Sequence, residues 1–248
     1  MSGTGKIRVL LADDHTLIRQ GLRALFEKEA DVKVVGEARH GREAVHLVLA
    51  LKPDVVVMDI SMPRLNGFEA TQRIKRASPG TWVVALTVHG EEHHVRALLQ
   101  AGARGYIPKE APFSDLLAAV RAVHAGGYYL HPAISGRVVD GYLDGSKPPE
   151  GDDLLTPRER EVLQLVSEGY TNRRIATELG LSIKTVEAHR ARVMTKLKIH
   201  NAAGLTRYAL SRGMTDDPAA FRGKPFGEGA PGPQKPPASR GSRGGPRP

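Results

Sequence analysis

The sequence contains no cysteine, and this absence excludes disulfide bonds, thiolate zinc sites and cysteine nucleophiles. Long apolar runs are missing too, since no stretch approaches the roughly 18 apolar residues of a membrane-spanning helix. Residues 1–11 lack the apolar core of a secretory signal, and their apolar run contains Arg8. Together these absences predict a cytoplasmic protein without a membrane anchor.

The net charge of +9 is unevenly distributed along the chain. Residues 153–212 carry 11 basic and 6 acidic side chains, a surplus of 5, whereas the much longer segment 1–125 carries 17 and 14, a surplus of 3. Dense positive charge is expected of a domain that neutralises nucleic-acid phosphates, but a solvated surface has the same composition. The charge therefore needs a motif beside it before it indicates DNA binding.

The first 125 residues alternate between apolar runs and segments with a helical period. The expected strands are 7–12, 32–35, 55–58, 82–86 and 105–107, and the expected helices are 17–29, 41–51, 67–77, 91–101 and 113–125. The runs lack polar alternation, which is typical of strands covered by helices on both faces. The repeats predict a doubly wound α/β fold around a five-stranded parallel sheet. One apolar face of the first helix should lie on the sheet, formed by Leu17, Ile18, Leu22, Leu25 and Phe26.

Polar side chains stand where these strands should end. Asp13 and Asp14 follow the first strand and Asp59 follows the third, and the carboxyl ends of parallel strands share one edge. Three clustered carboxylates repel one another and need a cation, for which Mg²⁺ is the natural choice beside phosphate. Thr87 after the fourth strand can offer a hydroxyl, and Lys109 after the fifth a fixed positive charge. The set indicates an aspartate that accepts a phosphoryl group.

Each of these residues alone also has a purely structural explanation. An Asp–Asp pair after a strand is commonly a helix cap or a solvated turn, and a lone threonine or lysine at a strand end is commonly structural. Their common order along the strands favours a site. His89, His93 and His94 lack the closing ligands of a transition-metal site and are expected at a solvated helix start. His15 is assigned no catalytic role.

Residues 156–213 carry several helix-start signals. Thr156 can cap a helix in which Glu159 completes a capping box, and Thr171 and Ser182 can cap two more. Gly180 suits the turn between the second and third helices. The pattern predicts a small all-α helix-turn-helix domain, although an ordinary three-helix bundle with a charged face would share it. The third helix should point these residues toward a DNA major groove: Lys184, Thr185, Glu187, Ala188, Ala191, Arg192 and Thr195.

Composition divides the chain further. Residues 126–152 lose the strand–helix pattern and are expected to be a linker, in which 134–143 could form a short helix. Residues 213–248 are rich in proline, glycine and arginine and are predicted to be disordered, because they cannot bury enough apolar surface. The predicted domains are therefore 6–125 and 153–212.

The N-terminal region resembles the receiver domain of two-component response regulators over nearly all of residues 6–125. The matching stretches are Val9-Leu-Leu-Ala-Asp-Asp-His15, Pro53-Asp-Val-Val-Val-Met-Asp59-Ile-Ser-Met-Pro63, Leu65-Asn-Gly-Phe68, Ala85-Leu-Thr87 and Gly102-Ala-Arg-Gly-Tyr-Ile-Pro-Lys109. The resemblance implies a flavodoxin-like fold in which Asp59 takes a phosphoryl group from a sensor histidine kinase.

The same resemblance implies roles for the neighbouring residues. Asp14, Asp59 and the Ser61 carbonyl would bind Mg²⁺ directly, with Asp13 acting chiefly through water. Thr87 and Tyr106 match the switch pair, in which the threonine moves toward the aspartyl phosphate and the tyrosine changes rotamer. Two positions depart from the pattern: Val88 follows the threonine where many receivers have a small residue, and Glu110 follows Lys109 where many have proline.

The C-terminal region resembles the LuxR-type helix-turn-helix over about residues 153–212. The matching stretches are Leu155-Thr-Pro-Arg-Glu-Arg-Glu-Val-Leu163, Glu168-Gly-Tyr-Thr-Asn-Arg-Arg-Ile-Ala176 and Thr185-Val-Glu-Ala-His-Arg-Ala-Arg-Val-Met194, with Arg190 where many relatives carry an aliphatic residue. A receiver followed by this domain is the NarL/FixJ architecture. It implies that phosphorylation controls sequence-specific DNA binding and transcription, that a homodimer reads two half-sites of double-stranded DNA, and that the protein catalyses nothing beyond slow self-dephosphorylation.

Two other functions are compatible with parts of this pattern. A regulator that ignores phosphorylation could use its receiver only for dimerisation, although the complete set of site residues argues against this. A haloacid-dehalogenase-type phosphatase also forms an aspartyl phosphate, but it needs a second acid two residues after the nucleophile. Here that position holds Ser61.

Overall fold

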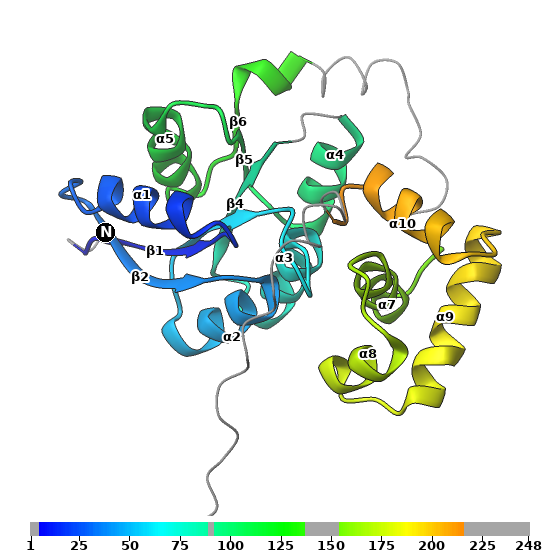
Figure 1. The fold of residues 1–248 in the computed structure, drawn as a ribbon. Helices are drawn as coiled ribbons and strands as arrows, with labels where there is room; N and C mark the ends of the chain where they lie inside the picture. The colour runs from blue at the N-terminus through cyan, green and yellow to red at the C-terminus, as the bar shows by residue number, and fades with distance from the viewer. Residues whose placement is uncertain (1–4, 89–91, 137–153, 216–248) are drawn as a thin grey trace, which may run out of the picture.

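The computed structural model describes residues 5–88, 92–136 and 154–215, which form an α/β unit followed by a helical unit (Figure 1). Most of the predicted linker and residues 216–248 of the predicted tail lie outside the described residues, as do the side chains of His89, His93 and His94. Met214, in the part of that tail that is described, packs in the core of the helical unit. In the described part of the chain, no helix is both long and apolar enough to cross a membrane.

The α/β unit is built on a parallel sheet in the order β2-β1-β3-β4-β5-β6. Its strands are β1 (Ile7–Ala12), β2 (Val32–Ala38), β3 (Val55–Asp59), β4 (Trp82–Thr87), β5 (Gly105–Pro108) and β6 (Tyr129–Leu130). The parallel doubly wound fold is confirmed, but the described sheet has six strands where five were predicted. The extra strand β6 lies in the segment predicted as a linker, and two residues are too few to show a strand period.

Helices cover both faces of this sheet. They are α1 (Thr16–Phe26), α2 (Gly41–Leu51), α3 (Gly67–Ala77), α4 (Glu92–Ala101) and α5 (Phe113–His124). Alternate strand residues enter two apolar clusters, one shared with α2, α3 and α4 and the other with α1 and α5. All five residues of β3 are buried, which explains why that strand shows no polar alternation.

The predicted packing face of α1 is wrong in part. Phe26 is buried and contacts Phe113 of α5, but Leu17 is 82% exposed, and Ile18 and Leu25 are also exposed. The inward positions are instead taken by Arg19, Leu22 and Phe26. The Arg19 guanidinium is buried because Nη1 donates to the Asp13 carbonyl at 2.7 Å and Nε donates to Glu37 at 3.0 Å. Hydrogen bonds from Arg19 to groups outside α1 thus accompany a helix orientation that differs from the one predicted from hydrophobicity alone.

The helical unit contains α7 (Pro157–Ser167), α8 (Asn172–Leu179), α9 (Ile183–Leu197) and α10 (Ala202–Ser211) around its own apolar core. The three predicted caps are confirmed, because Thr156, Thr171 and Ser182 each accept a hydrogen bond from the backbone N–H three residues on. Glu159 closes the capping box, and Gly180 has a left-handed conformation with φ of 63°. The helix α10 was not distinguished from the sequence. The unit meets the receiver through α7, which lies beside α3 (Figure 1).

A first prediction concerns the close approach of α3 to the sheet. A Cβ on Gly67 would lie 2.2 Å from the Asp59 carbonyl oxygen and 2.9 Å from the Ile60 Cα, so Gly67→Ala should destabilise the protein by about 3 kcal/mol. Gly21→Ala is the matched control: nothing lies within 4 Å of its Cβ position in α1, and it should add about 0.5–1 kcal/mol. Urea unfolding of both variants measures these values, and equal effects would contradict the packing argument.

Candidate functional site

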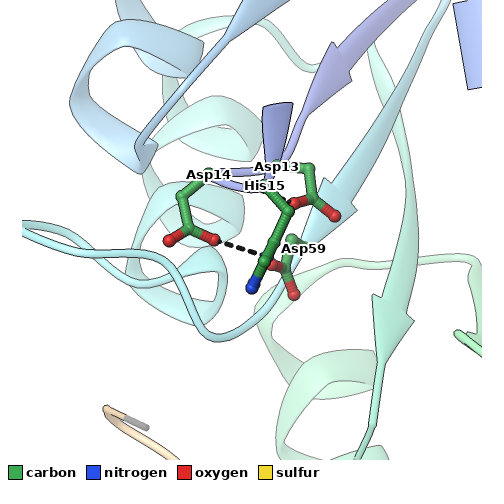
Figure 2. Close-up of side chains that lie close together, drawn as sticks. All are labelled: Asp13, Asp14, His15 and Asp59. Carbon is green, nitrogen blue, oxygen red and sulfur yellow. Dashed lines mark hydrogen bonds and ion pairs between the residues drawn. The ribbon is translucent and has the colours of Figure 1, made fainter. Parts of the chain in front are cut away.

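The polar residues predicted at strand ends meet at the carboxyl edge of the sheet. Asp13 follows β1, Asp59 ends β3, Thr87 ends β4 and Lys109 follows β5, and these four strands are neighbours. Figure 2 shows the His15 side chain between the Asp14 carboxylate on one side and the Asp13 and Asp59 carboxylates on the other. The parallel topology therefore brings together residues whose successive members lie 22 to 46 positions apart in the sequence.

The Lys109 ammonium bridges two buried carboxylates. Its Nζ lies 2.7 Å from Asp59 Oδ2 and 3.0 Å from Asp13 Oδ2. Asp59 is 1% exposed and Asp13 is 2% exposed, so both charges are largely removed from water. The Lys109 backbone N–H also donates to the Thr87 carbonyl at 2.8 Å, which ties the two predicted site residues together.

Burial sets the titration of this pair. It raises the pKa of Asp59 from 3.8 to about 6; the charge of Lys109 opposes the shift, while Asp13 and Asp14 add to it. Burial also works to lower the pKa of Lys109, but the charges of Asp59 and Asp13 outweigh it and the net shift is upward. Lys109 is consequently a fixed cation at neutral pH. Its charge only partly offsets the free-energy cost of keeping Asp59 ionised in this buried site.

The acidic cluster has the donors that a divalent cation needs. Asp13, Asp14, His15 and Asp59 each offer a ligand atom, and these atoms all lie within 4.8 Å of one another. Carboxylate oxygens favour a hard ion such as Mg²⁺, and an added cation would relieve their repulsion. The residues present therefore fit the predicted metal. Ser61, whose carbonyl was predicted as a further ligand, is buried and its N–H donates to Asp59 Oδ1 at 3.3 Å.

Two other predicted site residues occupy neighbouring strands. Thr87 is buried at the end of β4. Tyr106 is buried in β5, where its backbone is paired with Ala85 of β4, and its ring packs in the cluster shared with α3 and α4. Val88, which follows Thr87 where many receivers have a small residue, is 53% exposed at the carboxyl edge of the sheet.

Two contributors to the site were given no catalytic role from the sequence. His15 Nδ1 lies 3.1 Å from Asp13 Oδ1 and 3.0 Å from Asp14 Oδ1, so its ring belongs to the acidic cluster. Its position directly after the acid pair was the available signal. Arg19 holds the Asp13 carbonyl from α1, and its spacing from Leu22 and Phe26 is the helical period that marks an inward face.

The predicted DNA-contacting residues lie mainly on the exposed side of α9. Val186 and Val193 are buried in the core, and six of the seven predicted residues are exposed. Thr185 is only half-exposed, and its hydroxyl lies 2.8 Å from that of the cap Ser182. Arg190, which stands where many relatives carry an aliphatic residue, donates to Asn172 Oδ1 of α8 at 2.9 Å and thereby connects α9 to α8.

Comparison with known families agrees with both regions. Residues 9–121 match the response regulator receiver domain, and residues 153–209 match the bacterial regulatory proteins of the luxR family. A solved RcsB from Salmonella enterica serovar Typhimurium, bound to promoter rprA with the phosphomimetic BeF3⁻, is 28% identical with a TM-score of 0.55 and covers 82% of this chain and 98% of its own.

Curated relatives extend over both regions. The oxygen regulatory protein NreC of Staphylococcus carnosus is 36% identical over 85% of this chain and 100% of its own length. The transcriptional regulatory protein MctR of Rhizobium johnstonii is 37% identical over 86% of this chain and 98% of its own length. With the buried aspartate–lysine site and the exposed helix of a helix-turn-helix on one chain, these matches show that the protein belongs to the two-component response regulators of the LuxR-type, NarL/FixJ class, which regulate transcription under control of phosphorylation.

Proposed function

We propose that Asp59 accepts a phosphoryl group from a sensor histidine kinase and that this modification controls sequence-specific DNA binding by α9. The observation that carries the proposal is the Lys109 Nζ contact of 2.7 Å with Asp59 at the carboxyl edge of the sheet. A nucleophilic carboxylate held against a fixed cation suits phosphoryl transfer, in which catalysis is mainly positioning and charge neutralisation.

In the transfer, a carboxylate oxygen of Asp59 bonds to phosphorus while the N–P bond of the phosphohistidine breaks. The imidazole leaves with the electron pair and takes a proton from solvent. Lys109 offsets charge on the phosphoryl oxygens, and the Thr87 hydroxyl donates to one of them. Tyr106 changes rotamer as Thr87 moves, which carries the change to the surface of the receiver.

Asp14, Asp59 and the Ser61 carbonyl would hold Mg²⁺ directly and Asp13 through water. The ion supplies charge neutralisation at the phosphoryl group when bound. We infer no enzymatic turnover beyond slow self-dephosphorylation, because a phosphatase of the aspartyl-phosphate type needs an acid where Ser61 stands. Val88 beside Thr87 controls water access and therefore the lifetime of the phosphate.

The DNA-binding part of the proposal assigns 6–125 to the receiver, extended by β6 and Ile134, and the rest of 126–152 to the linker. It assigns 153–212 to the DNA-binding domain, extended by Met214, and the rest of 213–248 to a passive tail. The phosphorylated protein forms a homodimer in the cytoplasm, and each α9 reads one half-site of a promoter. The basic surplus of the second domain supports the phosphate contacts of such a complex.

The first test of this proposal is chemical. Asp59→Asn should abolish labelling by acetyl phosphate and Mg²⁺, seen as loss of the acyl-phosphate band on a phosphate-affinity gel. Asp31→Asn, which changes an exposed aspartate paired with Arg121, is the control and should label normally. Undiminished labelling of Asp59→Asn would overturn the site. DNA affinity that does not respond to phosphorylation would instead favour a regulator using its receiver only for dimerisation.

The raised pKa of Asp59 gives a stability prediction. Without metal at pH 8 the ionised carboxylate costs about 3 kcal/mol, so Asp59→Asn should be more stable than wild type by about 1–3 kcal/mol. As pH falls from about 6 toward 4, Asp59 binds a proton in the native state before it does so in the unfolded chain. Wild type therefore gains stability, and the stability difference between Asp59→Asn and wild type disappears. Mg²⁺ should stabilise wild type only. Thermal denaturation at pH 8 and pH 5 measures this, and a less stable Asn variant at pH 8 would contradict it.

The exposed face of α9 gives a third test. Arg192→Ala should weaken binding to the operator by about 1–3 kcal/mol, which fluorescence anisotropy at fixed salt can measure. The operator for this experiment is selected from random DNA with the phosphorylated protein. Arg207→Ala on α10 removes a comparably exposed charge outside α9 and should change binding much less. Equal losses would show that α9 has no special role.

A further inference from the structure

A polar stripe on α7 faces the receiver and includes Glu161 and Gln164, which are 2% and 1% exposed. Gln164 bonds the Met62 carbonyl at 2.9 Å and the Asn66 N–H at 3.0 Å, and Glu161 pairs with arginines of the receiver. Among the described residues, the apolar clusters of the two domains are separate, so polar groups hold this docked arrangement.

Three arginines surround the buried carboxylate of Glu161. Arg42 of α2 and Arg73 of α3 reach it from the receiver, and Arg158 reaches it from within α7. Arg42 Nη2 and Arg158 Nη1 lie 3.3 Å and 2.8 Å from the same oxygen, Oε2, while Arg73 pairs with Oε1. The three arginine side chains are partly exposed, so this arginine cluster forms an outer layer over the carboxylate.

The carboxylates near the arginine cluster are too few to balance it. Glu161 is bonded to all three guanidiniums. Glu178 and Glu69 are close enough to act on the cluster, but Glu69 is itself paired with Arg160. Three positive charges therefore meet two negative ones, and the cluster keeps a positive surplus.

The titration of the arginines shows the cost of this surplus. Burial lowers the pKa of Arg42, Arg73 and Arg158, and repulsion from Arg42 adds to the shift at the other two. Arginine nevertheless stays protonated in proteins. The like charges are therefore held together at a cost in free energy, which an added anion would reduce.

The cluster also has more hydrogen-bond donors than acceptors. Each guanidinium carries five N–H donors. Within the described residues, the three share the two oxygens of Glu161 and two carbonyls at the end of α8. Arg42 Nη1 donates to the Glu178 carbonyl at 3.0 Å, and Arg158 Nη2 donates to the Leu179 carbonyl at 2.6 Å. Arg42 Nε is buried there without a hydrogen-bond partner. Surplus donors and surplus charge together favour a ligand with several anionic oxygens.

We propose that Arg42, Arg73 and Arg158 form a binding site for a phosphate dianion, either inorganic phosphate or the phosphate group of a small molecule such as a nucleotide. Planar guanidiniums match phosphate oxygens with paired hydrogen bonds, and they do so better than the point charge of lysine. The dianion supplies the negative charge that the cluster lacks and accepts from its free outward donors. The site has the opposite charge to the acidic cluster around Asp59 and is separate from it.

The proposed site joins the two domains. Arg42 and Arg73 belong to the receiver and Arg158 belongs to the helical unit, so a dianion bound by all three favours the docked arrangement. In that arrangement the predicted α9 residues other than Thr185 are exposed, and α9 lies on the side of its domain away from the sheet (Figure 1). Bound phosphate therefore fixes the position of α9 without covering it.

The experiment measures binding of inorganic phosphate to the full-length protein by isothermal titration calorimetry, at pH 8, without Mg²⁺ and at constant ionic strength. Arg73→Gln and Arg158→Gln should each weaken binding at least about tenfold, because each removes charged donors to the phosphate. Arg121→Gln is the matched control, since Arg121 is also partly exposed but is balanced by Glu29 and Asp31, and it should bind phosphate like wild type. A parallel titration with AMP identifies the source, since tighter binding than that of phosphate would indicate a nucleotide.

Glu161→Gln separates a phosphate site from a purely structural cluster. Removing this carboxylate enlarges the positive surplus, so the variant should lose thermal stability in chloride, regain it in phosphate, and bind phosphate at least about threefold more tightly than wild type. A variant that phosphate neither stabilises nor binds more tightly would overturn the site. Wild type without measurable phosphate binding would overturn it too, as would binding that Lys109→Met abolishes and the arginine variants leave unchanged.

Discussion

Burial of negative charge at the carboxyl edge of the sheet is the constraint on which the rest of this structure depends. Asp13 and Asp59 are almost fully buried with the Lys109 ammonium between them, and yet the pKa of Asp59 stays raised at about 6. The site therefore holds its ionised nucleophile at a cost in free energy. A cation or a phosphoryl group bridged to lysine lowers that cost, so loading changes the balance between receiver conformations.

The backbone around this edge is held from opposite sides, which keeps the repelling groups together. On one side Arg19 of α1 binds the Asp13 carbonyl. On the other, Gly67 lets α3 begin against the Asp59 carbonyl, at a distance that no side chain would permit, and its N–H donates to the Ile60 carbonyl. The segment between Asp59 and Gly67 is thus short and tightly connected, so a contact with this segment is close to a contact with the site.

Residues whose position follows from local pattern could be predicted, and those set by distant partners could not. Asp59 and Lys109 were placed correctly because apolar runs mark strand ends, and Thr156 because a cap bonds its own helix. Arg19 was missed because its hydrogen-bond partners lie outside α1. Leu17 was wrongly assigned to the sheet face because the apolar pattern alone does not show that Arg19 is the residue buried there. The polar stripe of α7 has the composition of a solvated surface, and only the tertiary contact distinguishes the two.

The division between apolar and polar contacts explains how one chain can be both stable and responsive. Each domain buries its own apolar cluster, so separation exposes no core. The contact between domains consists of hydrogen bonds and ion pairs, whose net contribution is small because water replaces them on opening. A dianion that joins Arg158 to the arginines of the receiver is enough to shift such a balance. Since α9 is exposed in the docked arrangement, a change in the contact between domains alters where α9 lies and leaves its exposure unchanged. The position of the two α9 helices in a dimer determines DNA binding, because each must reach one of two half-sites about 34 Å apart.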